Sequence, residues 1–249
     1  MALIGLTPAA LAFAATAAFV AAFVRGLAGF GMAILLVPLL GLMVLPVEAV
    51  IVSNLLGLLI GLTGLRRTWA EADQTSALTI GGLATITTPV GLILLHATDP
   101  AWARVLIAMV AVISFVLVLL PPRPDGHRAH SAEIAATGLA AGMLTGFAGM
   151  PGPPVVPFYL RQALPAVRAR ASMLLVFLAT SLASSVSGVA LGLAGPRHAV
   201  LALLLFGPIW IGNRLGSYAF GRISDRVWRW LVALLLAASG IAALVQLAQ

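Results

Sequence analysis

The chain has 249 residues, of which 61% are hydrophobic and only 8% are charged. Soluble domains carry roughly 25% charged residues, so this composition excludes a chain that folds around a single core in water. The formal net charge is +7, and every positive residue is an arginine. The arginines lie mainly at the ends of apolar segments, and no basic stripe with interleaved aromatic residues indicates a nucleic-acid partner. Because the chain has no cysteine, disulfides and thiolate metal centres are also excluded.

Apolar segments follow one another along the whole chain, and most are long enough to cross a bilayer. In the first half we expect spans at about Pro8–Val24, a short segment that ends near Leu45, Val47–Leu65, Ala77–Leu95 and Trp102–Leu120. In the second half we expect Ala132–Thr145, a short segment that ends near Leu160, Ala171–Leu193, Ala199–Phe220 and Val227–Leu247. The first segment has no positively charged start, so we interpret it as a retained span rather than a signal peptide. The sequence thus predicts an all-α polytopic membrane protein in the lipid bilayer of the cell (inner) membrane.

The two halves show the same order of features. Each contains a glycine-rich stretch, residues 26–31 and residues 146–154, followed by an unusually short segment. The polar residues 121–130 predict a cytoplasmic linker between a first membrane repeat, residues 1–120, and a second, residues 131–249. A constant shift of 119 residues places Pro38, Pro46, Ser53 and Pro89 on Pro157, Pro165, Ser172 and Pro208.

Loop charges indicate that the two repeats have opposite orientations. Arg66 and Arg67 follow the third segment, whose counterpart is followed only by Arg197. The short segment of the second half is followed by arginines, whereas its first-half counterpart is not. Positive loops face the cytoplasm, so equivalent loops lie on opposite sides of the membrane, as in inverted-topology repeats. The expected cytoplasmic loops are residues 66–76, 121–130, 161–170 and 222–229.

The glycine-rich stretches are the main candidates for substrate binding. A non-helical backbone at membrane depth is tolerated only where protein or a water-filled cavity shelters it. A helix that restarts after such a break presents unpaired N–H groups and a positive dipole end, which suit an anion. The candidate residues are Gly26, Gly29, Gly31, Gly146, Gly149 and Gly152. The alternative is that these glycines only allow close packing of helices.

Polar residues near these stretches are further candidates. Arg25 pairs with an anionic substrate if it lies deep in the membrane, and is an interfacial anchor if the first segment spans fully. Ser53, Asn54 and Ser172 bind either a ligand or a neighbouring helix. Arg214 lies inside a predicted span, which favours a functional role, although a snorkelling side chain that reaches the cytoplasmic surface is the alternative.

Residue types for catalysis or metal binding form no recognisable pattern. The carboxylates and the four histidines lie mostly in predicted loops or at segment starts, and no pair has a convincing metal-ligand spacing. The motifs of membrane hydrolases and the phosphate-binding loop are absent. We therefore expect no catalytic residue, no metal site and no cofactor, and a transporter rather than an enzyme.

The two glycine-rich stretches carry a family resemblance. Residues 26–31 running to Pro38, and residues 146–152 running to Pro157, resemble the sulfite exporter TauE/SafE family, also grouped as toluene-sulfonate uptake permeases. The resemblance covers nearly the whole chain, including the segment from Pro208 to Gly216. It implies a secondary carrier of small sulfur-containing anions, such as sulfite or sulfonates, usually described as export.

The resulting hypothesis is an exporter of small sulfur-containing anions that works by alternating access at a midplane site between the repeats. Two alternatives remain open: a carrier of another small metabolite or of a metal ion, and a membrane enzyme or assembly factor. Carboxylates or histidines in the spans would favour a cation, and a nucleophile and base in one cavity would favour an enzyme. The sequence leaves the exact substrate, the direction of transport, the coupling ion and the oligomeric state open.

Overall fold

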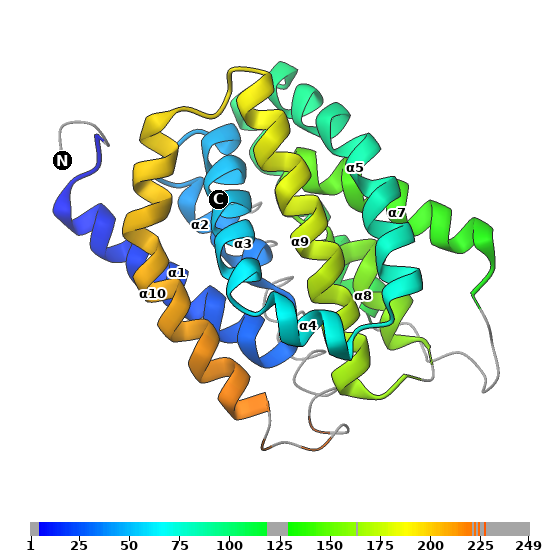
Figure 1. The fold of residues 1–249 in the computed structure, drawn as a ribbon. Helices are drawn as coiled ribbons and strands as arrows, with labels where there is room; N and C mark the ends of the chain where they lie inside the picture. Colours follow the sequence, from blue (N-terminus) through cyan, green and yellow to red (C-terminus); the bar gives the residue numbers. More distant parts are fainter. Residues whose placement is uncertain are drawn as a thin grey trace.

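The structure is a computed structural model that describes residues 5–118, 129–162, 164–220, 222, 224 and 227 of the chain. This part of the chain is all-helical (Figure 1). Its helices in chain order are α1 (Pro8–Ala28), α2 (Met32–Leu40), α3 (Pro46–Thr63), α4 (Leu65–Glu71), α5 (Gln74–Ala97), α6 (Pro100–Val118), α7 (Ser131–Ala148), α8 (Gly152–Leu160), α9 (Ala166–Ala190) and α10 (Pro196–Phe220). Apart from Val227, the predicted span at Val227–Leu247 lies outside the described residues, as does most of the predicted linker.

Five of the described helices are long and apolar enough to cross a membrane: α1, α3, α5, α9 and α10. Their lengths of 18 to 25 residues correspond to the thickness of a bilayer core at a rise of about 1.5 Å per residue. The prediction of an all-helical multi-pass membrane protein is therefore confirmed at this level.

Two interruptions of the helical backbone occur where the glycine-rich stretches predict them. α1 ends at Ala28, and Gly29 and Gly31 then adopt positive φ angles of 88° and 95° before the nine-residue helix α2 begins. α7 ends at Ala148, and Gly149 has a φ of 69° before the equally short α8. A side chain is strained in this left-handed region, which explains why glycine stands there. We call residues 29–31 the first break and residues 149–151 the second break.

The helix boundaries correct three details of the sequence-based prediction. α1 and α7 each continue past the expected end, so Gly26 and Gly146 lie inside helices rather than within the breaks. The stretch expected to be polar and irregular after the third span contains the short helix α4. The first short segment ends at Leu40, earlier than expected, because Gly41 follows it and a turn leads to α3.

Glycines bring two pairs of long helices into close contact. At Gly212 and Gly216 of α10, an added Cβ would overlap the carbonyl oxygens of Phe19 and Phe23 in α1. At Gly91 of α5, it would overlap the main chain of α7. Small residues allow this approach, which replaces the hydrophobic driving force that lipid does not supply. The pairs α1–α10 and α5–α7 are therefore closely packed, and α3 and α9 lie between them (Figure 1).

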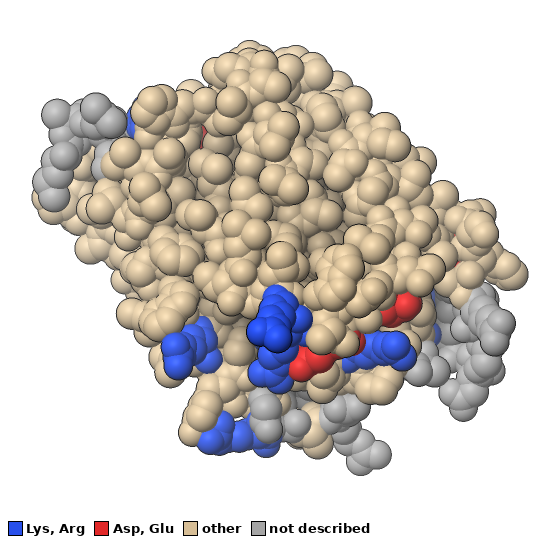
Figure 2. All heavy atoms as spheres, in the orientation of Figure 1, with Lys and Arg blue, Asp and Glu red and all other residues tan. Residues whose placement is uncertain are grey.

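Many of the charged residues lie at one end of the bundle, and the ion pair of Arg197 and Glu48 lies at the other. Figure 2 shows the larger group along the lower edge of this face, below a wide surface without charges. They belong to α4 and its surroundings, to the start of α9 and to the residues after α10: Arg66, Arg67, Glu71, Asp73, Arg168 and Arg222. Three loops that the sequence predicts to be cytoplasmic thus contribute charges to the same end of the molecule.

Glycine contacts between helices give a first test. We expect Gly91→Ala and Gly216→Ala to lower the free energy of unfolding by about 1–3 kcal/mol each, because the new methyl group overlaps main-chain atoms that cannot move aside. Gly82→Ala and Gly207→Ala, in the same two helices, meet nothing within 4 Å and serve as matched controls. The measurement is the thermal unfolding midpoint in detergent. Equal midpoints for test and control variants would show that the helices do not approach so closely.

Candidate functional site

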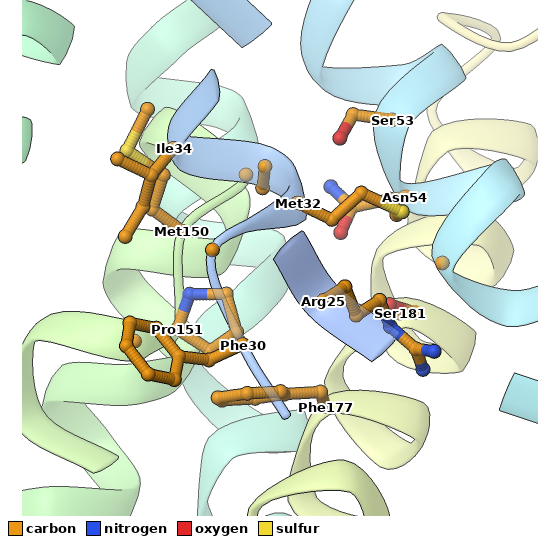
Figure 3. Close-up of a pocket in the computed structure, with 15 residues that line it drawn as sticks. Arg25, Phe30, Met32, Ile34, Ser53, Asn54, Met150, Pro151, Phe177 and Ser181 are labelled. Carbon is orange, nitrogen blue, oxygen red and sulfur yellow. The ribbon is translucent and has the colours of Figure 1, made fainter. Parts of the chain in front are cut away.

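Both breaks line one small cavity inside the bundle, which we call the deep cavity. Its volume is about 50 Å³, enough for a small anion or a few waters, since one water needs roughly 10–15 Å³ by this measure. Residues of both breaks line it, together with Ser53 and Asn54 of α3 and Phe177 and Ser181 of α9 (Figure 3). Two interruptions that are far apart in the sequence therefore meet at one buried place.

The first turns of the two short helices differ as hydrogen-bond donors. The first N–H groups of an α-helix have no partner within the helix and carry the positive end of its dipole. In α2 they belong to residues 32–34, all of which line the deep cavity. In α8 the second and third positions are Pro153 and Pro154, which have no N–H, so Gly152 donates there alone. The main-chain donors of the cavity thus come mostly from α2.

Ser53 is the polar side chain of the cavity whose bonding capacity is unused. It is 2% exposed, and its Oγ has no hydrogen-bond partner in the protein. A buried polar atom without a partner costs free energy of about 1–3 kcal/mol, and such atoms are rare in folded proteins. The neighbouring Asn54 is held in place because its Nδ2 donates to the Val50 carbonyl at 3.0 Å. A buried hydroxyl that lacks a protein partner in the lining of a cavity is suited to bind a polar guest.

Arg25 is buried at the edge of the deep cavity. It is 6% exposed, and its Nη1 donates a hydrogen bond of 2.9 Å to the Asn213 Oδ1 of α10. This partner is a neutral amide, so the guanidinium retains its positive potential. In Figure 3 the guanidinium is directed away from Pro151 of the second break. Arg25 therefore lies in the interior, where an unneutralised arginine is costly and usually functional.

A second, wider cavity of about 410 Å³ lies next to the deep one, towards the charged end of the bundle. Its lining includes Arg67, Arg170 and Arg222, and Arg25 lines both cavities. Arg25 is thus the side chain that the two cavities share.

Three candidate glycines have packing roles instead. Gly26 packs against α10 and Gly146 against α5, which favours the alternative of close helix contact for these two positions. Gly29 lies in the first break, where an added Cβ would press on the Arg170 side chain. In contrast, Gly31, Gly149 and Gly152 line the deep cavity.

Two polar candidates lie away from the deep cavity. Ser172 Oγ donates to the Arg168 carbonyl at 2.8 Å and accepts from the Asp73 N–H at 2.8 Å, so its bonding is satisfied between α9 and the start of α5. Arg214 is exposed, and its guanidinium lies 5.2 Å from the centre of the Trp210 ring. Neither residue lines the deep or the wide cavity.

The structure adds residues that the sequence does not single out. Met32 and Phe177 contribute apolar walls to the deep cavity, and Ser181 contributes a second hydroxyl. The sequence places Arg170 in a loop, but it lies in the second turn of α9 and donates to the Gly26 carbonyl and, at 3.1 Å, to Ser217 Oγ. The sequence gives no indication of these residues, because only the packing of helices that are distant in the sequence brings them to the cavities.

The described helices thus combine several apolar spans with a buried cavity between two interrupted helices, which are features of membrane transporters. A protein-family model described as "Sulfite exporter TauE/SafE" matches residues 14–243, and the chain belongs to this family. The resemblance noted in the sequence is thereby confirmed. Family membership implies a membrane transporter of sulfur-containing anions. No curated protein and no solved structure matches the chain.

The contact between the first break and α9 is testable through its glycine. We expect Gly29→Ala to destabilise the protein for two reasons: the left-handed backbone costs about 1–2 kcal/mol for a side chain, and the methyl group displaces Arg170. Gly192→Ala has a similar φ of 70° but open space, so it carries the backbone strain alone. The difference between the two unfolding midpoints measures the Arg170 contact. No difference would mean that Arg170 does not pack on the first break.

Proposed function

We propose that the protein is a secondary transporter that exports small sulfur-containing oxyanions, such as sulfite or organosulfonates, by alternating access. The deep cavity is its substrate site, and the two halves of the chain are inverted-topology repeats. The observation that carries the proposal is that both breaks line one buried cavity beside an arginine and an unpartnered serine hydroxyl.

The lining of the deep cavity favours an oxyanion over a cation. Among the described residues that line the deep cavity, Arg25 is the charged one. The N–H groups at the start of α2 carry the positive end of the helix dipole, so they add to the positive potential of the cavity. A sulfur oxyanion has a compact charge with several acceptor oxygens, which matches N–H, hydroxyl and guanidinium donors. Met32, Phe30 and Phe177 supply an apolar surface that suits a small organic substituent. Sulfite and short sulfonates meet both demands.

Reciprocal contacts support the inverted repeat. An added Cβ on Gly26 would meet Asn213 and Ser217 of α10, and one on Gly146 would meet Thr88 and Leu92 of α5. In return, Gly216 approaches Phe23 and Leu27 of α1 as Gly91 approaches Met143 and Phe147 of α7. The same pattern thus recurs between α1–α10 and α7–α5. These helix contacts pair Gly91 with Gly216. The 119-residue shift that aligns Pro89 with Pro208 would instead place Gly216 on Ala97, so the two pairings differ in this segment.

Each pair joins a helix of one repeat to a helix of the other, which is the arrangement that alternating access uses. A substrate site at the meeting point of inverted repeats is exposed to one side and then to the other when the repeats rock. The wide cavity at the charged end provides access on one side. At the opposite helix ends, Arg197 Nη1 of α10 contacts Glu48 Oε1 of α3 at 3.2 Å. This ion pair joins α10 to α3 on the other side.

The main test is transport of sulfite by purified protein in proteoliposomes. We expect Ser53→Ala to raise the KM for sulfite about tenfold or more, because a hydrogen bond to a charged partner contributes about 1.5–3 kcal/mol. The same variant should unfold at an equal or higher temperature, since it removes a buried hydroxyl that has no protein partner. Flux of radiolabelled sulfite and thermal unfolding measure the two effects.

Ser184→Ala is the matched control. Ser184 is 1% exposed, its Oγ also lacks a partner, and it lines neither the deep nor the wide cavity. We expect Ser184→Ala to leave the KM for sulfite unchanged and, like Ser53→Ala, to unfold at an equal or higher temperature. The proposal is wrong if neither sulfite nor any tested sulfonate is bound or moved while a cation is.

A further inference from the structure

We propose that the wide cavity is a second anion-binding site, a vestibule that receives the oxyanion before it passes Arg25 into the deep cavity. This inference rests on the proposed function for the identity of the anion, but it concerns a separate site. Four arginines line the vestibule, Arg25, Arg67, Arg170 and Arg222, together with one carboxylate, Glu71.

Hydrogen-bond partners leave most of this positive charge unneutralised. Arg67 Nε donates to Glu71 Oε1 at 2.8 Å, so that pair is nearly neutral. Arg222 Nη1 donates to the carbonyl oxygen of Tyr218 at 3.2 Å, and Arg25 and Arg170 also donate to neutral oxygens. A cleft lined by one sign of charge between low-dielectric walls concentrates ions of the opposite sign. The vestibule therefore attracts anions in preference to cations.

Arg170 is built as the main contact of this site. Its Nη2 is fixed by the Gly26 carbonyl and by Ser217 Oγ, and its guanidinium lies 4.6 Å from the centre of the Phe220 ring. Its Nε is buried and has no hydrogen-bond partner. A guanidinium that is held in place at the wall of a cavity is preorganised to bind an oxyanion. Arg170 is therefore the anchor of the vestibule.

Arg25 connects this site with the deep cavity. It is the residue common to the linings of both, and Asn213, which accepts its hydrogen bond, lines the vestibule. An anion that leaves Arg170 meets Arg25 next, and beyond Arg25 it meets the N–H groups of α2 and Ser53. Because Asn213 is a neutral partner, an anion displaces it from Arg25 at a lower cost than it would displace a carboxylate.

The alternative is that these arginines only anchor helix ends at the cytoplasmic surface. Arg168 fits that role, because it is exposed, lies in the same helix as Arg170 and lines neither cavity. Arg168→Gln is therefore the matched control for Arg170→Gln: both remove one positive charge from the start of α9, and only one changes the vestibule.

The test combines binding and transport of radiolabelled sulfite at low ionic strength. We expect the wild type to bind two equivalents of sulfite. Ser53→Ala should retain the equivalent in the vestibule, and Arg170→Gln should retain the one in the deep cavity. Arg170→Gln should raise the KM for transport about tenfold, with a smaller effect on the maximal rate. Added salt should reduce this difference, because it screens the attraction between the vestibule and the anion. Arg168→Gln should match the wild type.

Arg222→Gln provides a second variant if Arg170→Gln does not fold, because Arg222 follows α10 and its side chain is exposed. It should raise the KM in the same salt-dependent way by a smaller factor. A single binding equivalent that Ser53→Ala abolishes, with a KM unaffected by Arg170→Gln and Arg222→Gln, overturns the vestibule and leaves the proposed function intact. Two binding equivalents, of which Arg170→Gln loses one, without any sulfite transport would support the vestibule and reject the proposed function.

Discussion

The interrupted helices depend on one constraint: lipid offers no hydrogen-bond partner to an open main chain. Residues 29 and 30 of the first break and residues 149–151 of the second are buried in the protein. They are enclosed because glycine contacts draw α10 onto α1 and α5 onto α7, and because α3 and α9 cross between these pairs. The close packing of the long helices and the open backbone of the breaks are therefore parts of one arrangement. Each requires glycine, but for a different reason: space in one case and a positive φ in the other.

The electrostatics of the interior follow from the same arrangement. Within the described residues no group of acidic or histidine side chains suited to a metal ion occurs, and Arg25 contacts an amide rather than a carboxylate. Helix starts and arginines instead supply positive potential at the end of a path that begins between charged loops. Burial of a guanidinium costs several kcal/mol unless a partner compensates it. In a site that accepts anions, the bound anion compensates the buried guanidinium, and this relief favours binding.

Sequence patterns predict the helical membrane architecture and both breaks, since a glycine run before a short apolar segment is typical of a helix that stops and restarts. They do not predict which glycines face the cavity, because the helical period continues past the expected segment ends and takes Gly26 and Gly146 into α1 and α7. The sequence does not indicate Arg170 for a related reason. Its neighbours in the sequence are typical of a charged loop, but α9 begins at Ala166 and carries it into the bundle. Such placements depend on packing between distant helices, which no local pattern contains.

The likeness of the two halves extends to their breaks and short helices, but not to the residues around the deep cavity. Thr145 occupies the place in α7 that Arg25 occupies in α1, and its hydroxyl donates to the Ala141 carbonyl of its own helix at 2.7 Å. The prolines at the start of α8 remove donors that α2 retains. The first half therefore supplies a charge and most of the main-chain donors around the deep cavity, and the start of α8 supplies few. For this reason Ser172, the mate of Ser53 in the sequence, is a structural residue, whereas α9 reaches the deep cavity with Phe177 and Ser181. The two breaks determine where the deep cavity forms, while its chemistry is set by the residues in which the two halves differ.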